Sequence, residues 1–503
     1  MGFFDKLQKP GHTALKQQKG VSHTETRKDL NVTRNPYLNQ IQKKQIKTIS
    51  RLTPERHSRH STPDHSAKRK SSKPKTLTPE TGSNSRKRAS STPQRQDWGS
   101  DDEGSDSDLN EVAKRVRRST TIEPDPKRRI QSRKAFSDED GGRFDMVHAA
   151  NIASLVDPKK YRIAFPDFLD AKQIQLQYPS ASQQEKYELV VANSDDDFKA
   201  LEDIREVIEV IIAKYLPGHV QDNLNDESTG LVRRIKRASQ RLAGNEYIAL
   251  INEWNETLNT YREDGTIEKN ISEWKTVDLS LCEFILTQAY ARTVSLKVDG
   301  LRKYKAGENN VYGELLPKFV SKILREDTKM KADQVFIDFG SGVGNVVLQA
   351  ALEVGCASWG CEITEHSCEL ADLQKKEFEA RCRLWGLSAG EIHLERGDFL
   401  ANEILREVLP KADVVLVNNQ AFQPEQNDKL IHLFLDLKDG ATIVSLKSFA
   451  PVGQKNKSWN SGAIYNIFDV VEKRYYDHSV SWTNASGTYY VAKKDSKRMR
   501  ALE

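Results

Sequence analysis

The sequence predicts an α/β fold for its C-terminal half: an open, mostly parallel sheet that follows a helical region and a disordered basic arm. Three patterns predict this organisation. Beyond residue 311, short apolar runs alternate with helical segments, as in doubly wound parallel sheets. From residue 168 to about 293, apolar residues recur every three or four positions, which is typical of helices. Before residue 144, aromatic residues are almost absent.

Residues 1 to 134 form a basic arm with 31 Lys and Arg against 15 Asp and Glu, a net charge of +16. The other 369 residues carry 46 basic and 57 acidic side chains, a net of −11, so the overall +5 hides a basic arm joined to an acidic body. Ser, Thr, Pro, Lys and Arg dominate the arm, which leaves too little apolar area to offset the entropy cost of ordering it. We therefore expect residues 1–143 to be disordered.

Clusters of basic residues in the arm suit a nuclear import signal or contacts with nucleic-acid phosphates. They are KRK at 68–70, RKR at 86–88, KRVRR at 114–118 and PKRR at 126–129. The alternative is a solvated tail. Phosphorylation of Thr-Pro pairs would weaken phosphate binding by lowering the net charge. Such pairs begin at Thr53, Thr62, Thr78 and Thr92.

The cysteines, five in number, include no C-x-x-C pair, which argues against a disulfide framework or a structural zinc site. No run of about 18 apolar residues occurs, and the N-terminus lacks the apolar core of a signal peptide. We therefore expect a soluble, intracellular protein that binds no metal ion and no membrane.

The region from 144 to 305 is expected to be mainly helical. Residues 195–216 begin with three aspartates, and negative charge favours a helix N-terminus. Residues 231–263 predict one long helix or two, and a further helix is expected from Leu281. The region ends in the turn-rich stretch 298–314. We interpret these helices as a cap or scaffold for the sheet.

Five apolar runs are expected to form parallel strands, with helices between them. The runs are VFID, SWGCE, IHLERGD, VVLVNN and ATIVSLK. The helical segments are Leu315 to Leu324, Val343 to Val354, Glu365 to Trp385 and Asn427 to Leu437. The last two strands, near Val470 to Tyr476 and Gly487 to Lys493, have no helix between them and predict an antiparallel hairpin at the sheet edge.

A glycine-rich loop, Asp338-Phe-Gly-Ser-Gly-Val-Gly344, joins the first strand to its helix, where open α/β sheets bind ligands. Its spacing is G-x-G-x-G rather than the dinucleotide fingerprint G-x-G-x-x-G, and Asp338 lies two residues before the first glycine. A carboxylate there would repel a pyrophosphate and attract a cationic ligand with an amino-acid end, such as S-adenosylmethionine. A single loop of this kind can also be an ordinary turn between a strand and a helix.

Further polar residues follow the next strands. Glu362 ends the second strand, 24 residues after Asp338, where an acid accepts hydrogen bonds from ribose hydroxyls. Asp398 and Phe399 end the third, and suit the amino group and the ring of adenine. VNNQAF, which contains Asn418, ends the fourth. Many amino methyltransferases have Asn or Asp followed by two prolines and an aromatic residue there, and this chain keeps the first Asn without the prolines.

The motifs VYGEL, DFGSGVGNVVLQAA, ERGDFL, VNNQAF and SWT…YY, in this order, resemble the disruptor-of-telomeric-silencing family of non-SET histone H3 lysine methyltransferases. The resemblance is strong over about residues 300 to 495, looser from about 160, and favours a fungal-type member. It implies a class I S-adenosylmethionine-dependent methyltransferase that modifies a lysine in the globular core of nucleosomal histone H3. The implied parts are a basic arm (1–143), a mainly helical part of the catalytic core (144–305), the α/β domain (306–495) and a charged tail (496–503).

The resemblance also implies roles for individual residues. Those expected to bind S-adenosylmethionine are Tyr312, Gly313, Glu314, Leu315, Asp338, Gly340, Gly342, Gly344, Asn345, Gln349, Glu362, Asp398, Phe399 and Asn418. Those expected to line a narrow channel for the target lysine are Asn418, Trp482 and Tyr489. For Trp482 and Tyr489 the alternative is ordinary packing at the edge strand. Leu315 departs from animal members, which have a hydroxyl residue there, so one polar contact to the cofactor is in doubt.

The implied location is the nucleus and the implied partner is the nucleosome, including histone H3, the histone H4 tail and ubiquitylated H2B, with DNA bound through the basic arm. The implied processes are chromatin regulation, telomeric silencing and the DNA damage checkpoint. Two other functions stay open at this point: an adenine amino methyltransferase acting on DNA or RNA, and a chromatin-binding adaptor without activity. Labelled cofactor offered with nucleosomes or with bare nucleic acid distinguishes the enzymes, and any turnover excludes the adaptor.

Overall fold

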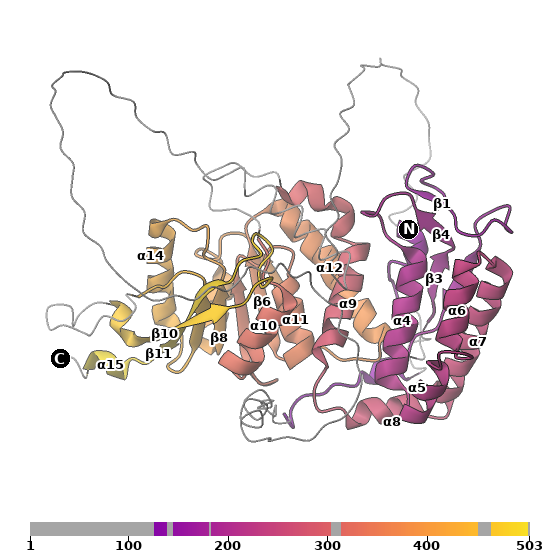
Figure 1. Cartoon of the computed structure of the whole chain (residues 1–503). Coiled ribbons are helices and arrows are strands. Elements are labelled where there is room, and N and C mark those ends of the chain that lie inside the picture. Colours follow the sequence, from indigo (N-terminus) through magenta and orange to yellow (C-terminus); the bar gives the residue numbers. More distant parts are fainter. Residues whose placement is uncertain (1–124, 138–143, 181–182, 303–312, 451–463, 501–503) are drawn as a thin grey trace, which may run out of the picture. The chain divides into compact units, whose positions relative to one another are not determined.

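The computed structural model describes residues 125–137, 144–180, 183–302, 313–450 and 464–500 (Figure 1). Residues 1–124 lie outside these ranges, so the expected disorder of the basic arm stays a prediction. Within the described ranges, no helix is long and apolar enough to cross a lipid bilayer. All five cysteines lie in these ranges as buried free thiols.

The C-terminal half is a seven-stranded, mostly parallel sheet with the order β10-β11-β9-β8-β5-β6-β7. The strands are β5 (Val335–Phe339), β6 (Ala357–Glu362), β7 (Ile392–Arg396), β8 (Val414–Val417), β9 (Thr442–Ser445), β10 (Phe468–Tyr475) and β11 (Gly487–Lys494). The five from β5 to β9 are parallel, whereas β11 pairs antiparallel with both β9 and β10. The predicted fold class and the predicted hairpin are confirmed.

Chain order reverses beside β5, because β6 and β8 are its two neighbours. In open sheets, ligands bind at the carboxyl ends of the strands at such a reversal. We therefore expect the ligand-binding site at the carboxyl ends of β5, β6 and β8.

Helices cover both faces of this sheet. Side chains alternate between the two faces along each strand, so Phe336 packs with one layer and Ile337 with the other. The first layer holds α10 (Pro317–Ser321) and α11 (Asn345–Gln349), which continue as π-helices over Lys322–Asp327 and Ala350–Val354. The second holds α13 (Glu403–Val408) and α14 (Pro424–Leu433). Sequence patterns predicted all but α13, which has only six residues.

The N-terminal region is less helical than expected. Four short strands precede its long helices: β1 (Tyr161–Ile163), β2 (Gln173–Leu176), β3 (Glu185–Glu188) and β4 (Val190–Ala192). They form two two-stranded sheets, β1-β4 and β2-β3. Strands of three or four residues carry too few apolar positions to show a period, so the expectation of helix from residue 168 was wrong before Ala200.

The long helices follow from there (Figure 1). They are α4 (Ala200–Tyr215), α5 (Gly218–Leu224), α6 (Leu231–Gln240), α7 (Gly244–Glu263), α8 (Thr266–Glu273), α9 (Leu279–Arg292) and, after β6, α12 (Glu365–Leu384). The segment 231–263 forms two helices, since Leu242 between them has a φ of 58°. α9 packs along α12, so the helical region and the sheet domain share one core.

The end of the predicted arm packs on the body, which corrects one expectation. Arg128, in the PKRR cluster, donates to the carbonyls of Leu352 (2.7 Å) and Ser388 (2.8 Å). Burial lowers the pKa of Arg128 to about 10. The amide of Ser132 donates a hydrogen bond to the carbonyl of Gly386, and Ile130 and Ala135, on either side of Ser132 in the sequence, are buried. Arg128 is therefore held by the body instead of being offered to a phosphate or an import receptor.

A buried ion network joins four elements. Glu185, on β3, receives hydrogen bonds from Arg381 of α12 (2.5 and 3.0 Å) and from Arg292 of α9 (2.9 Å). Arg292 also contacts Asp203 of α4 (2.6 Å), and Arg381 contacts Glu377 (2.7 Å). The side chains of Glu185, Arg292 and Arg381 are fully buried. Burial alone would raise the pKa of Glu185, but the two guanidinium groups lower it to about 2.

Replacing Glu185 with Gln is expected to lower the free energy of unfolding by about 1–3 kcal/mol, because Arg292 and Arg381 each lose one of their two buried carboxylate partners. The stabilisation by Glu185 is complete above its unfolded pKa, roughly 4.3, and is lost as pH falls toward the folded value of about 2. Urea titrations of both proteins at pH 7 and at lower pH measure the difference.

The matched control is Glu253→Gln, which breaks the half-exposed pair with Arg234 (2.6 Å). That change is expected to cost less than about 1 kcal/mol. Equal losses for the two variants would show that the buried network contributes no more than a surface pair.

Candidate active site

The glycine loop after β5 forms the floor of the candidate site. The amides of Gly340 and Ser341 both donate to the carbonyl of Cys361 (3.0 and 3.1 Å), which ties the loop to the end of β6. Gly340, Gly342 and Gly344 have φ of 82°, 56° and 87°, a region that other residues rarely adopt. The loop can turn this sharply only with glycine, and it leaves an open surface at the carboxyl end of β5.

Two carboxyl groups flank the loop. Asp338, the fourth residue of β5, is 4% exposed, and burial followed by the charge of Glu362 raises its pKa to about 7. Glu362 ends β6 and accepts from the amides of Gly342 (2.9 Å) and Thr364 (2.8 Å). The carboxyl group of Asp338 makes no hydrogen bond or ion pair with any residue that the structure describes. A carboxyl group in this state fits a cationic ligand, which would restore its charge.

Aromatic side chains form one wall. Phe399 stacks on Phe339, with ring centroids 5.1 Å apart and planes at 14°, and on Phe422 at 6.0 Å and 21°. Phe422 also lies beside Gly340, where an added Cβ would be 3.9 Å from its ring. Asp398, the residue before Phe399, is exposed, and its carboxylate accepts a hydrogen bond from the amide of Leu400 (2.9 Å). The wall suits a flat ring with a polar edge.

The opposite wall brings together three of the sequence motifs. The Asn418 amide, just past β8, donates to the carbonyl of Gly313 (3.0 Å). A Cβ at Gly313 would lie 2.7 Å from the indole of Trp482, so glycine lets the indole pack on the backbone. The side-chain oxygen of Asn418 is buried and has no partner among the described residues. This oxygen can accept a hydrogen bond from a bound ligand.

The chain segments behind this wall pair like short strands. The amide of Glu314 donates to the Ser481 hydroxyl (2.8 Å), and the amide of Ser481 donates to the Glu314 carbonyl (2.9 Å). Leu315 forms an isolated bridge with Val480. Asn345, the first residue of α11, donates to the Glu314 carboxylate (2.9 Å). Glu314, Leu315 and Asn345 therefore belong to one connected surface beside the glycine loop.

Gln349 donates to the carbonyl of Pro317 (2.8 Å) and to Glu353 (2.9 Å), and it lines a small pocket together with Glu314, Leu315 and Asn345. Two other predicted site residues are not placed at this surface by the described structure. Tyr489 is fully buried and donates to Asp327 (2.6 Å), so its predicted place in the lysine channel stays a prediction. Side chains alternate between the two faces along β11, and the side chain of Tyr489 lies on the face that α10 covers. Tyr312 lies outside the described residues.

Sequence reasoning missed Asn419 and Phe422. The Asn419 side chain is fully buried and accepts from the amides of Leu446 (3.0 Å) and Lys447 (2.8 Å), which ties the end of β8 to the chain after β9. Phe422 completes the aromatic wall. Both belong to VNNQAF, so the only available signal was the second polar residue and the aromatic residue of that motif.

The strand order and the ligand-binding edge define a class I methyltransferase, the class to which S-adenosylmethionine-dependent enzymes with this sheet belong. Residues 290–493 match the model of the family described as Histone methylation protein DOT1. The chain belongs to this family of histone methyltransferases, as the motif resemblance implied.

Three relatives share the printed name "Histone-lysine N-methyltransferase, H3 lysine-79 specific". The protein of Aspergillus fumigatus is 44% identical over 513 residues, which cover 100% of this chain and 99% of the relative. That of Emericella nidulans is 49% identical over 389 residues, 77% of each chain. That of Gibberella zeae is 46% identical over 374 residues, 73% of this chain and 74% of the relative. All three relatives come from fungi, which agrees with a fungal-type member.

Replacing Gly313 with Ala is expected to displace Trp482, because the new Cβ would meet the indole at 2.7 Å. A misplacement of about 1 Å in a catalytic wall lowers turnover by up to about 10²-fold. Methyl transfer and the unfolding midpoint are measured on the same preparations. The control is Gly218→Ala at the start of α5, where a Cβ meets nothing within 4 Å. Full activity in Gly313→Ala would show that this wall is not part of the site.

Proposed function

We propose that this protein transfers the methyl group of S-adenosylmethionine to lysine 79 of histone H3 within the nucleosome. The relatives support the substrate, since their names print this specificity. The observation that carries the proposal is the buried carboxyl group of Asp338, which lies at the sheet's ligand-binding edge without a described counter-charge. A ligand with a cationic amino-acid end fits that position.

The residues present would hold such a ligand along the edge of the sheet. Asp338 would bind the amino group, and Glu362 would accept from the ribose hydroxyls with lone pairs left free by its two backbone contacts. The stacked rings of Phe399 and Phe422 would pack against the adenine ring, with Asp398 at its polar edge. S-adenosylmethionine supplies an electrophilic methyl group when bound.

The target amine must be neutral to react, and deprotonating a free lysine at pH 7 costs roughly 4–5 kcal/mol. The indole of Trp482 disfavours an ammonium ion by excluding water from one side of the site. The side-chain oxygen of Asn418, which has no partner among the described residues, would accept a hydrogen bond from the amine and so align its nitrogen. Asn418 is itself held by Gly313, so its direction is set before the substrate arrives.

The basic arm would supply the contact with the nucleosome that the body lacks. A body of net charge −11 is repelled by DNA, whereas residues 1–134 carry +16. Because Arg128 is held by the body, the tether is assigned to residues 1–124. We further propose a nuclear location, and contacts with the histone H4 tail and ubiquitylated H2B, from the family resemblance.

S-adenosylmethionine is expected to bind more weakly as pH falls below about 7, because protonation removes the charge of Asp338. The loss is roughly tenfold per pH unit below that pKa. Calorimetry between pH 5.5 and 8.5 measures it. Asp338→Asn should bind weakly at every pH, whereas Glu391→Gln, an exposed control before β7, should follow the unchanged protein. The same pH slope in Asp338→Asn would remove Asp338 from the site.

The whole proposal is tested by offering labelled S-adenosylmethionine with nucleosomes, free histone H3 or bare DNA. The full chain is expected to modify nucleosomal H3 in preference to free H3, and not DNA. A chain that starts at residue 125 should bind S-adenosylmethionine normally but bind nucleosomes more weakly. If the arm makes 6 to 10 phosphate contacts, the affinity of the full chain falls by about 10³–10⁵ between 50 and 200 mM salt.

The outcomes separate the two claims. Label in DNA alone would support the alternative of an adenine methyltransferase. Label in histone H3 with equal nucleosome affinity and salt slope for both chains would keep the enzyme and reject the tether. Lys429→Gln removes a positive charge from the sheet domain, and its nucleosome affinity serves as a control for the loss of a charge outside the arm.

A further inference from the structure

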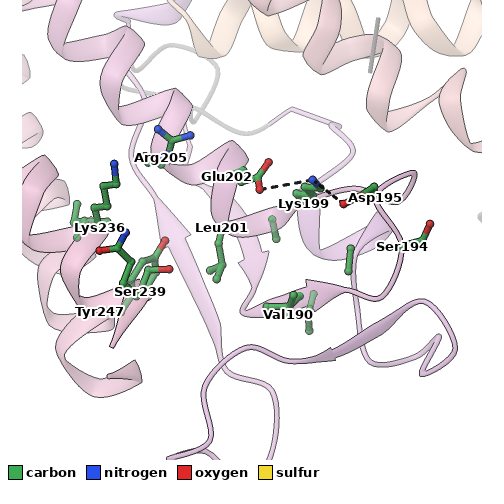
Figure 2. Close-up of a pocket in the computed structure, with 15 residues that line it drawn as sticks. Val190, Ser194, Asp195, Lys199, Leu201, Glu202, Arg205, Lys236, Ser239 and Tyr247 are labelled. Atoms are coloured by element: carbon green, nitrogen blue, oxygen red, sulfur yellow. Dashed lines mark ion pairs between the residues drawn. The ribbon is translucent and has the colours of Figure 1, made fainter. Parts of the chain in front are cut away.

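The N-terminal region contains a cavity that the proposed methyl-transfer site does not use (Figure 2). It lies between β4, α4, α6 and α7 and has a volume of about 390 Å³. Sites for small molecules typically have volumes of roughly 300–1,000 Å³. The cavity is therefore large enough for a compact organic molecule.

Apolar side chains form most of the cavity's body. β4 contributes Val190 and Ala192, α4 contributes Ala200 and Leu201, and α6 contributes Ile235. β4 belongs to a two-stranded sheet and pairs only with β1 among the described strands. These walls would cover an apolar group on several sides, which favours its removal from water.

The charged residues at the rim are not equivalent. Lys199 is paired with Asp195 (3.4 Å) and Glu202 (3.8 Å), as the dashed lines in Figure 2 show. Arg205 pairs with Glu209 (3.1 Å). Lys236 is exposed and forms no ion pair with any carboxylate of the described residues. The rim thus offers one positive charge, Lys236, that is unpaired among the described residues, while Lys199 and Arg205 already contact carboxylates.

The cavity also has a hydrogen-bond donor without an acceptor. Tyr247, on α7, is 1% exposed, and its hydroxyl has no partner among the described residues. Burial raises the pKa of Tyr247, so the hydroxyl keeps its proton at neutral pH. A buried donor without an acceptor costs about 1–3 kcal/mol, which a suitable acceptor would remove. Ser239 and Gln240 of α6 add further polar groups at the same side.

We propose that this cavity binds a compact organic carboxylate, with the apolar body against β4 and α4 and the carboxylate at Lys236, within reach of Tyr247. A monoanion matches the single free charge, whereas a phosphate dianion would require a second cation, and Lys199 and Arg205 are already paired.

The carboxylate can belong to a free small acid or to the C-terminus of a peptide, and two pairs of probes distinguish these sources. The first pair is 4-phenylbutyrate and its neutral amide, and the second is acetyl-Val-Leu with a free or an amidated C-terminus. Binding to the full chain is measured by NMR titration of each probe. Each acid is expected to bind with a Kd of about 1 mM, as for other ligands of this size, and each amide about tenfold more weakly or worse. The acid that binds more tightly identifies the source.

Variants locate the binding. Lys236→Gln should weaken the acids about tenfold and leave the amides unchanged, because it removes one charge-assisted contact. Arg233→Gln is the matched control, since it removes an exposed charge from the same helix but does not line the cavity. Tyr247→Phe keeps the ring and should weaken the acids by roughly two- to tenfold.

Two results would overturn the proposal. One is equal affinity for acid and amide in the unchanged protein, and the other is equal weakening by Lys236→Gln and Arg233→Gln. Unfolding midpoints of all three variants are measured to confirm that each is folded. Unchanged affinity of the acids for Lys236→Gln would place the probe elsewhere on the chain and would overturn the proposal as well.

Discussion

The contact of Glu185 with Arg292 and Arg381 is the constraint on which the arrangement of the site depends. Arg381 lies on α12, the helix that follows Glu362 and β6. Earlier on α12, Gln374 donates to the carbonyl of Val343 (3.0 Å) and to the side chain of Asn345 (2.7 Å). A carboxylate in the N-terminal region therefore holds the helix that holds the glycine loop. The N-terminal region is part of the catalytic architecture, because a shift of α12 would move the loop.

Side-chain amides then fix the rest of the site to the sheet. Asn418 ties the end of β8 to Gly313, while Asn419 ties it to the chain after β9. Adjacent residues thus point to opposite sides and hold two separate segments. Because the described segments on both sides of this strand end are bonded to it, the wall formed by Gly313 and Trp482 is positioned by backbone carbonyls and amides as well as by apolar contact.

The sequence predicted the sheet domain well and the N-terminal region less well, for physical reasons. β5 to β9 are apolar runs separated by helices, so two periods alternate clearly. β1 to β4 are too short to show a period. Arg128 looked like part of an import signal because its burial depends on carbonyls more than 200 residues away. Motif position also could not reveal that Tyr489 packs in the layer of α10, since that depends on which face of β11 its side chain takes.

Two buried carboxyl groups in this protein have opposite pKa shifts, because one has buried cationic partners and the other does not among the described residues. Glu185 faces two arginines, which lower its pKa to about 2, and it stabilises the fold once ionised. Among the charged groups of the described residues, Glu362 is the one that acts on Asp338, and burial raises the pKa of Asp338 to about 7, so ionisation between its unfolded value and pH 7 destabilises the folded state. A destabilising buried charge of this kind is typical of functional sites, where a bound ligand of opposite charge offsets its free-energy cost. No cation of the described residues pairs with Asp338, and this is the clearest physical sign that this edge of the sheet binds a charged ligand. The buried arginines beside Glu185 show that the fold places cations where stability alone requires them.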